Sequence, residues 1–213
     1  MKTRALTHAL FLFAAITIGS SAPQSANATS MVPLTHSQLV DAADYIVRGK
    51  VVEVWAEQAA DGTVWTRAQV DISHTFKGKN RSHLVVDQMG GTWGESETLV
   101  HGGARFSAGE RVILFAEELG NGRIVSVGMQ QGKYTLRMDP YSQETIVQRF
   151  SPGPKAAYDH RFIPLPPKAD RLVVTDFEDE ITDRLQSGWD GKPIPGSSIQ
   201  RLQRINANTA EVK

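Results

Sequence analysis

Alternating apolar and polar positions mark the middle of the chain. In the run VWTRAQVDISHTF, residues 64–76, every second side chain belongs to one face, and His74 falls on the apolar one. Because side chains alternate across a strand, this run predicts a half-buried β-strand. The run before it, YIVRGKVVEVWAE from Tyr45, is rich in β-branched residues and predicts a long strand.

Glycines and turn residues interrupt these runs. Gly49 and the adjacent apolar pair Val51-Val52 break the alternation of the first strand and predict a bulge or a strong bend. Asp61-Gly62 predicts a two-residue hairpin between the first two strands, because both residue types tolerate a positive φ. Asn121-Gly122 predicts a second hairpin in the same way.

Five further runs predict strands joined by short turns: HLVVDQM, RVILFAEE, RIVSV, KYTLRM and ETIVQRF. Together with the first two runs they make about seven strands, and no helical pattern between them is long enough to connect parallel strands. Residues Asp139 to Ser142 predict the turn between the last two runs. We therefore expect a mainly β fold, either an antiparallel barrel or a sandwich.

Two short helices are predicted outside the strands. Residues 35–38, THSQ, have the spacing of a capping box and predict a helix that runs to about Ala43. The run TDFEDEITDRLQSGW predicts a helix near residues 176–187, with Thr175 or Asp176 as its cap. Its apolar stripe predicts packing on the barrel, with a partner-binding helix as the alternative. The stripe consists of Phe177, Ile181 and Leu185.

The two ends of the chain differ in composition from its middle. Residues 1–28 have the basic, apolar and A-x-A order of a secretory signal peptide, with cleavage after Ala28. The apolar run, about eleven residues, is shorter than the ~20 that a membrane-spanning helix needs. We expect a secreted or periplasmic protein without a membrane span. Residues 29–150 would form the barrel, 151–196 a proline-rich extension with the second helix, and 197–213 a disordered tail.

Charge and cysteine content exclude several functions. The chain has 23 Lys and Arg against 23 Asp and Glu, so clustered positive charge gives no reason to expect nucleic-acid binding. Cysteine is absent, which excludes disulfides, thiolate metal sites and cysteine catalysis. The fold must be held by its core alone.

The glycine-rich segment MGGTWGESETLVHGG contains the residues that we consider for binding. Its spacing matches neither phosphate-loop pattern, so its glycines are interpreted as backbone positions that need a positive φ. Trp93 would be a binding anchor if exposed and a plug if buried, and we interpret it as a plug or rim residue over one end of the barrel. The candidate contact residues in and beside this segment are Gly90, Gly91, Trp93, Glu95, His101 and Arg105.

The histidines and carboxylates do not form a recognisable catalytic set. No H-x-x-x-H or H-E-x-x-H spacing occurs, and no G-x-S-x-G elbow is present. His74 and His83 could approach each other across the turn between their strands, and they are weak candidates for a metal or acid-base role. We expect a protein that is not an enzyme and that uses no cofactor.

Several short motifs resemble a known superfamily. AADYIVRGKVVEV at residues 42–54 and FKGK at residues 76–79 resemble the start of netrin-like domains and of the tissue inhibitors of metalloproteinases. With F..GE.V.LF at residues 106–115 and VGMQQGKY at residues 127–134, the chain also resembles a group of exported bacterial proteins of unassigned function. The resemblance covers about Ala42 to Leu136 and implies an OB-like barrel of about five to seven strands, with helices packed outside.

The resemblance does not extend to metalloproteinase inhibition, because those inhibitors chelate zinc through an N-terminal cysteine and this chain has none. We expect an exported, non-catalytic barrel that binds another exported protein, either a protease or a surface component. Its contact surface would be the N-terminal segment and the loop from Met89 to Gly103. The alternative is a barrel that binds a saccharide or small ligand by stacking on Trp55, Trp65 and Trp93. A periplasmic hydrolase is the third hypothesis.

Overall fold

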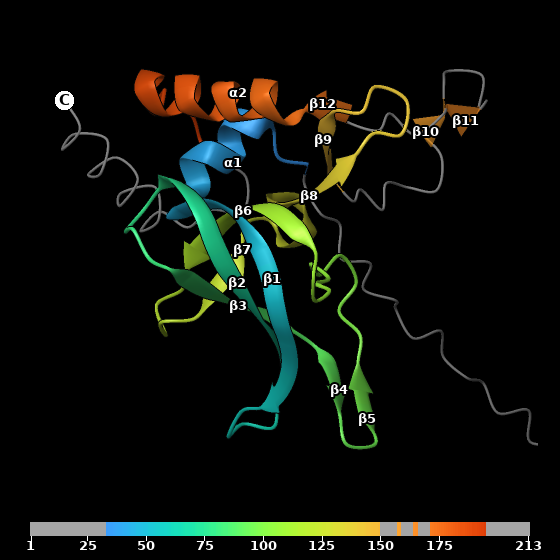
Figure 1. Cartoon of the computed structure of the whole chain (residues 1–213). Coiled ribbons are helices and arrows are strands. Elements are labelled where there is room, and N and C mark those ends of the chain that lie inside the picture. The colour runs from blue at the N-terminus through green and yellow to red at the C-terminus, as the bar shows by residue number, and fades with distance from the viewer. Residues whose placement is uncertain (1–32, 150–156, 159–163, 166–170, 195–213) are drawn as a thin grey trace, which may run out of the picture.

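The computed structural model describes residues 33–149, 157–158, 164–165 and 171–194 (Figure 1). The predicted signal peptide and the predicted C-terminal tail lie outside these residues, as does most of the proline-rich segment. The elements in chain order are α1 (His36–Ala42), β1 (Tyr45–Gln58), β2 (Val64–Lys77), β3 (His83–Met89), β4 (Gly91–Trp93), β5 (Ser96–Thr98), β6 (Arg111–Glu118), β7 (Ile124–Ser126), η1 (Met129–Gly132), β8 (Lys133–Met138), β9 (Thr145–Arg149), β10 (Ala157–Tyr158), β11 (Pro164–Leu165), β12 (Arg171–Val173) and α2 (Val174–Ser187).

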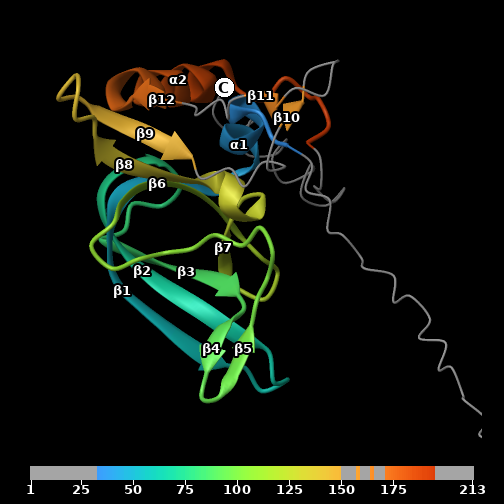
Figure 2. The same cartoon turned by 90° about the vertical axis from the view of Figure 1, so that its right-hand side faces the viewer.

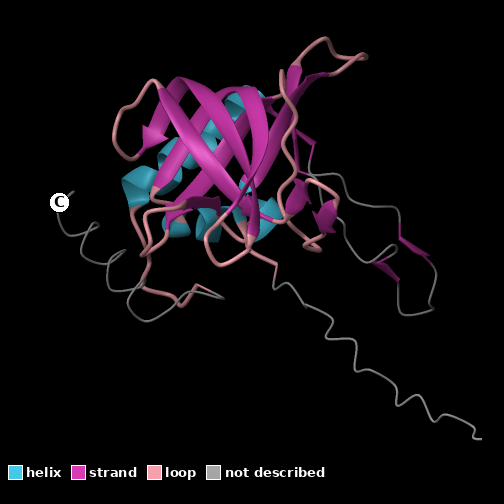
Figure 3. Ribbon diagram, turned by 90° about the horizontal axis from the view of Figure 1, so that it is seen from below, coloured by secondary structure: helices cyan, strands magenta, loops and turns pink. Residues whose placement is uncertain are grey.

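The main sheet confirms the predicted β fold. All seven predicted runs form strands, and the sheet has the order β1-β2-β3-β7-β6-β8-β9-β12. Its pairings are antiparallel except for the single parallel contact between β3 and β7. β6 also pairs with β1, so the pairings β1–β2, β2–β3, β3–β7, β7–β6 and β6–β1 form a circuit. Figure 3 shows these strands crossing in front of the helices.

β1 bends where its sequence predicted. The register between β1 and β2 shifts between Arg48 and Gly49 and again between Val51 and Glu53. A Cβ atom at Gly49 would meet the carbonyl oxygen of Asp71, so the two strands approach too closely there for any side chain. β1 pairs with β2 along one edge and with β6 along the other, and a bulge of this kind increases the local twist of the strand.

Two hydrophobic cores lie on opposite faces of β6. Val112, Leu114 and Ala116 point into the core enclosed by the circuit of strands, which also contains residues of β1, β2 and β3. Ile113 and Phe115 point to the other side, where the helices cover the sheet. A strand buried on both faces reads as a continuous apolar run, which explains the sequence RVILFAEE.

The helices lie together at the end of the molecule farthest from β4 and β5 (Figures 1 and 2). α1 begins with the predicted capping box, in which Thr35 and Gln38 each accept a backbone N–H of the other. The predicted cap of α2 is wrong. The extended backbone of β12 continues directly into the helix, so Val173 is the cap residue and makes no side-chain capping bond.

α2 buries its predicted stripe against the sheet. Phe177 and Ile181 are buried in the helix-side core, and Leu185 packs against its edge. Arg184 also holds α2 to α1 by a two-pronged contact with Asp41, at 3.0 Å from Nε and 2.6 Å from Nη2. Packing on the sheet is therefore confirmed for this helix.

Both predicted hairpins form, but their connections have five residues. In the first, the Ala59 N–H donates to the Thr63 carbonyl, and the Asp61 side chain accepts the Thr63 N–H at 2.9 Å. The second repeats this arrangement with the Asn121 side chain and the Arg123 N–H. The prediction of a two-residue turn is wrong because Asp61 and Asn121 use their side chains to close a wider loop, and only the glycine after each has a positive φ.

Candidate functional site

The glycine-rich segment forms a small hairpin that the sequence did not predict. Gly91 pairs with Thr98, Thr92 with Glu97 and Trp93 with Ser96. The hairpin projects beside the long β1–β2 hairpin, at the end of the molecule opposite the helices (Figures 1 and 2). Glu95 lies in the turn between the two short strands and is exposed.

Gly90 and Gly91 attach this hairpin to β2. The Gly90 N–H donates to the Val64 carbonyl at 2.8 Å, and the Thr66 hydroxyl donates to the Gly90 carbonyl at 2.7 Å. Gly90 has φ 94° and Gly91 has φ 136°. A Cβ on Gly91 would meet the Thr66 hydroxyl oxygen. The two glycines therefore permit close backbone approach, as the sequence predicted.

Apolar side chains are exposed on and beside the β4–β5 hairpin. Among the described residues six large hydrophobic side chains are exposed, and three of them, Met89, Trp93 and Leu99, belong to this region. Trp93 is 46% exposed, so of the two predicted positions, a plug or a rim residue, the plug is wrong. The physical reason is that β4 and β5 project beyond the main sheet and no described element covers the ring.

The chain that follows the hairpin is fixed to the body of the molecule. The Ala104 N–H donates to the Gln88 side chain at 2.9 Å, and the Gly102 carbonyl accepts the Gln130 N–H at 3.0 Å. The Arg105 carbonyl accepts from the Lys133 ammonium. His101 and the Arg105 side chain are exposed and make no hydrogen bond or ion pair with Trp93 or Glu95 in the described part of the chain. The structure therefore groups Trp93 with Glu95 but does not bring the other two side chains to them.

His74 and His83 are not brought together. Strand register places His83 opposite Asp71 and His74 opposite Arg48, and both histidines are exposed. The prediction that His74 faces inward is wrong, because His74 is exposed and lies where β2 extends beyond its pairing with β3. The described residues contain no group of three or more potential metal ligands.

A second cluster lies on the outer face of β1, β2 and β3, where the sequence indicated only alternation. Arg123 lies over the Trp65 ring at 4.4 Å, and Arg67 lies 5.5 Å from the Trp55 ring. Both arginines contact Asp87, at 2.8 Å from Arg67 and 3.2 Å from Arg123. Asp87 is 2% exposed, so its carboxylate is buried beneath the two cations. We call this group the Trp–Arg cluster; it consists of Trp55, Trp65, Arg67, Asp87 and Arg123. Glu57 also contacts both arginines.

Strand alternation puts Trp65 and Arg67 on one face of β2, but Arg123 comes from a turn about 55 positions later in the chain. Only the antiparallel pairing of β6 with β7 and the parallel contact of β7 with β3 bring it next to Asp87. The sequence could therefore indicate that Trp65 and Arg67 share a face, but not that Arg123 lies beside Asp87.

His36 has a pKa well below the usual value of a histidine. Its ring stacks on Phe177 with centroids 4.5 Å apart, and burial together with the positive charge of Arg149 lowers its pKa to about 4. Glu180 contacts Nδ1 at 3.1 Å, which would favour the charged ring. That carboxylate is 52% exposed, so its attraction is screened and burial dominates. His36 is therefore a neutral aromatic ring between the helices at neutral pH.

Comparison with known proteins gives no assignment. No family model matches the chain, and neither a curated protein nor a solved structure matches it. Within the described residues, no helix has the length and apolar character that crossing a membrane requires.

Proposed function

We propose that this protein is an exported, non-catalytic domain that binds another exported protein through the β4–β5 hairpin. The partner would be an exported protease or a surface component. The observation that carries the proposal is the exposure of Met89, Trp93 and Leu99 within one short region. Exposed apolar side chains that gather in one place are typical of protein interaction sites, whereas singly scattered ones are ordinary.

An OB-type barrel with netrin-like character is the fold that we propose for this domain. The circuit of strands supports it, because β1, β2, β3, β7 and β6 pair in order around a bent first strand. OB folds close in this manner through long, coiled strands. A rigid barrel would hold the hairpin at a fixed angle, which lowers the entropy cost of binding.

The proposal is tested by capture of partners from the fluid in which the protein is naturally found. Trp93→Ala combined with Leu99→Ser should lower the amount of captured partner at least about tenfold, because aromatic anchors dominate interface energies. Tyr141→Ala is the matched control, since Tyr141 is 90% exposed in the turn between β8 and β9, away from the hairpin. Equal capture by the double variant and the native protein would exclude the hairpin as the binding surface.

A saccharide or small ligand bound at the Trp–Arg cluster is the second candidate function. It is favoured by the half-buried rings of Trp55 and Trp65, which lie on one outer face beside charged groups. In OB folds the face of the second and third strands, with the flanking loops, binds oligosaccharides and oligonucleotides. A glycan panel should quench tryptophan fluorescence in the native protein and not in Trp65→Leu. Quenching that depends on Trp93 instead would move the site to the hairpin.

A further inference from the structure

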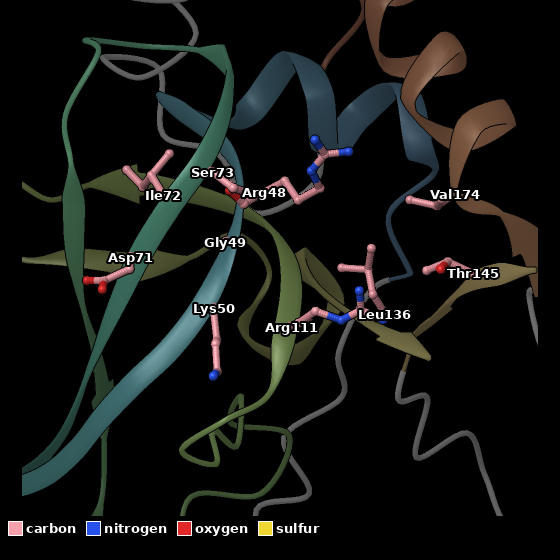
Figure 4. A pocket seen from close by; sticks show the side chains of 10 residues that line it. All are labelled: Arg48, Gly49, Lys50, Asp71, Ile72, Ser73, Arg111, Leu136, Thr145 and Val174. Carbon is pink, nitrogen blue, oxygen red and sulfur yellow. The ribbon is translucent and has the colours of Figure 1, made fainter. Parts of the chain in front are cut away.

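A cavity of about 450 Å³ opens on the helix side of the main sheet, beside the start of α2 (Figure 4). Three basic side chains line it, Arg48 and Lys50 from β1 and Arg111 from β6. Leu136 of β8 and Val174 of α2 form its apolar wall. Small-ligand sites have volumes of about 300–1,000 Å³ and combine apolar walls with a few polar groups.

The strand register explains why the basic residues lie here. Ile46 of β1 pairs with Phe115 of β6, and both are fully buried beneath the helices. Four positions further along β1, Lys50 pairs with Arg111 on the same face, because side chains alternate. This face of the β1–β6 pair is therefore apolar beneath the helices and basic beyond them.

Two of the three cations have no side-chain partner among the residues that the structure describes. The side chains of Lys50 and Arg111 make no hydrogen bond or ion pair within the described part of the chain, although the two residues are directly opposite each other. Like charges opposite each other destabilise a strand pair. Arg48 differs, because Glu178 of α2 accepts from its guanidinium at 2.7 Å.

Asp71 does not neutralise this pair. It is opposite Lys50 on β2, yet no ion pair joins them, and its carboxylate accepts instead from the Gln69 side chain at 3.2 Å. Figure 4 shows the Asp71 side chain pointing away from Arg111, while the Arg111 side chain extends toward Leu136. The Arg111 guanidinium is therefore directed at the apolar wall, whereas the Lys50 side chain points away from it (Figure 4).

We propose that this cavity binds a small organic anion. A phosphate or carboxylate headgroup would lie against Lys50 and Arg111, and the apolar part of the ligand against Leu136 and Val174. Arginine suits this role because its planar guanidinium donates two parallel hydrogen bonds to either headgroup. The site is distinct from the β4–β5 hairpin and does not depend on the function proposed for it.

Isothermal titration calorimetry of the full chain at low salt tests the proposal with four probes: octyl phosphate, octanoate, inorganic phosphate and octanol. At least one of the two amphiphilic anions should bind, and it should bind at least about tenfold more tightly than inorganic phosphate, because its chain is buried. Octanol should not bind measurably. Whichever of octyl phosphate and octanoate binds more tightly identifies the headgroup.

The combined variant Lys50→Gln, Arg111→Gln should weaken that binding at least about tenfold. Lys79→Gln is the matched control, since it removes one exposed positive charge in the turn after β2 and should leave binding unchanged. Both mutated cations are exposed, so the double variant should fold, and its melting curve checks this. The amphiphilic anion should raise the melting temperature of the native chain and not of the double variant.

Four results would overturn the proposal. They are no binding of either amphiphilic anion, unchanged binding by the double variant, equally tight binding of octanol, and inorganic phosphate binding as tightly as octyl phosphate. Equally tight binding of inorganic phosphate would indicate an inorganic-ion site only, and equally tight binding of octanol would indicate a purely apolar site.

Discussion

Two tryptophans of this molecule, Trp65 and Trp93, lie in contrasting places. Trp65 is half-buried on the main sheet, with the Arg123 guanidinium 4.4 Å from its ring and a buried carboxylate behind it. Trp93 is 46% exposed on a hairpin that projects from the sheet, and no described cation lies over it. The first ring is held by interactions within the chain, and the second has surface available for another molecule.

This difference separates structural from functional roles for one residue type. A ring whose contacts are internal contributes to stability, and its replacement should lower the free energy of unfolding. An exposed ring contributes little to folding, so its presence at a rigid site favours a role in binding. Replacement of single residues in the two places tests this division.

The largest effect is expected from Asp87→Ala. Removal of this buried carboxylate leaves Arg67 and Arg123 adjacent with only the partly exposed Glu57 as counter-charge, and breaking a buried ion pair costs about 3 kcal/mol. Urea denaturation measures the loss. Asp71→Ala, which removes an exposed carboxylate of β2, is the control and should cost less than about 0.5 kcal/mol. Equal losses of stability for Asp87→Ala and Asp71→Ala would show that the contacts of Asp87 contribute no more than an exposed carboxylate does.

Acid should weaken the helix-covered core and leave the β4–β5 hairpin unaffected. The pKa of His36 is about 4 in the folded chain against 6.5 for a free histidine, so between these values only the unfolded chain binds the proton. The stability contributed by the neutral ring is complete above pH 6.5 and is lost as the pH falls to 4. The loss is about 2–3 kcal/mol.

Thermal denaturation between pH 7 and pH 4 measures this dependence, and His36→Phe provides the comparison. Phenylalanine keeps the stacking on Phe177 and cannot bind a proton, so the variant should lose less stability in acid than the native chain. Parallel curves for the two proteins would contradict the assignment to His36.

The strands were predictable because their signals are local. The boundaries of HLVVDQM, RVILFAEE and KYTLRM agree with β3, β6 and β8, and each run is bounded by turn residues. The bend at Gly49 was equally local, since a glycine and a broken alternation occur in the same few positions. Thr35 and Gln38 were sufficient to place the start of α1.

The parts of the fold that the sequence did not predict depend on contacts between distant segments. β4 and β5 have no apolar alternation, and they form because Gly90 and Thr66 attach their base to β2. β12 is recognisable only by its pairing with β9. Because β12 continues directly into α2, the helix begins earlier than predicted, at Val174. Arg123 reaches Asp87 through the pairing of three strands, and Lys50 faces Arg111 through strand register. None of these contacts has a signature in a single run of residues.

Trp65→Leu should have a moderate effect on stability. It removes the stacking of Arg123 and part of the buried ring area, for a loss of about 1–2 kcal/mol in urea denaturation. Acrylamide should also quench this ring poorly in the native protein, because Arg123 shields one face. Trp65 would have to be regarded as another exposed ring if its replacement cost nothing.

Trp93→Leu should have the smallest effect on stability, below about 0.5 kcal/mol, because replacing an exposed side chain breaks few contacts. The same change should remove the most readily quenched component of tryptophan fluorescence, since 46% of this residue is open to solvent and Trp65 is shielded by Arg123. Both the free energy of unfolding and the quenching of fluorescence can be compared directly with those of Trp65→Leu. A loss of more than about 1 kcal/mol would mean that Trp93 supports the fold and would remove the reason to assign it to binding.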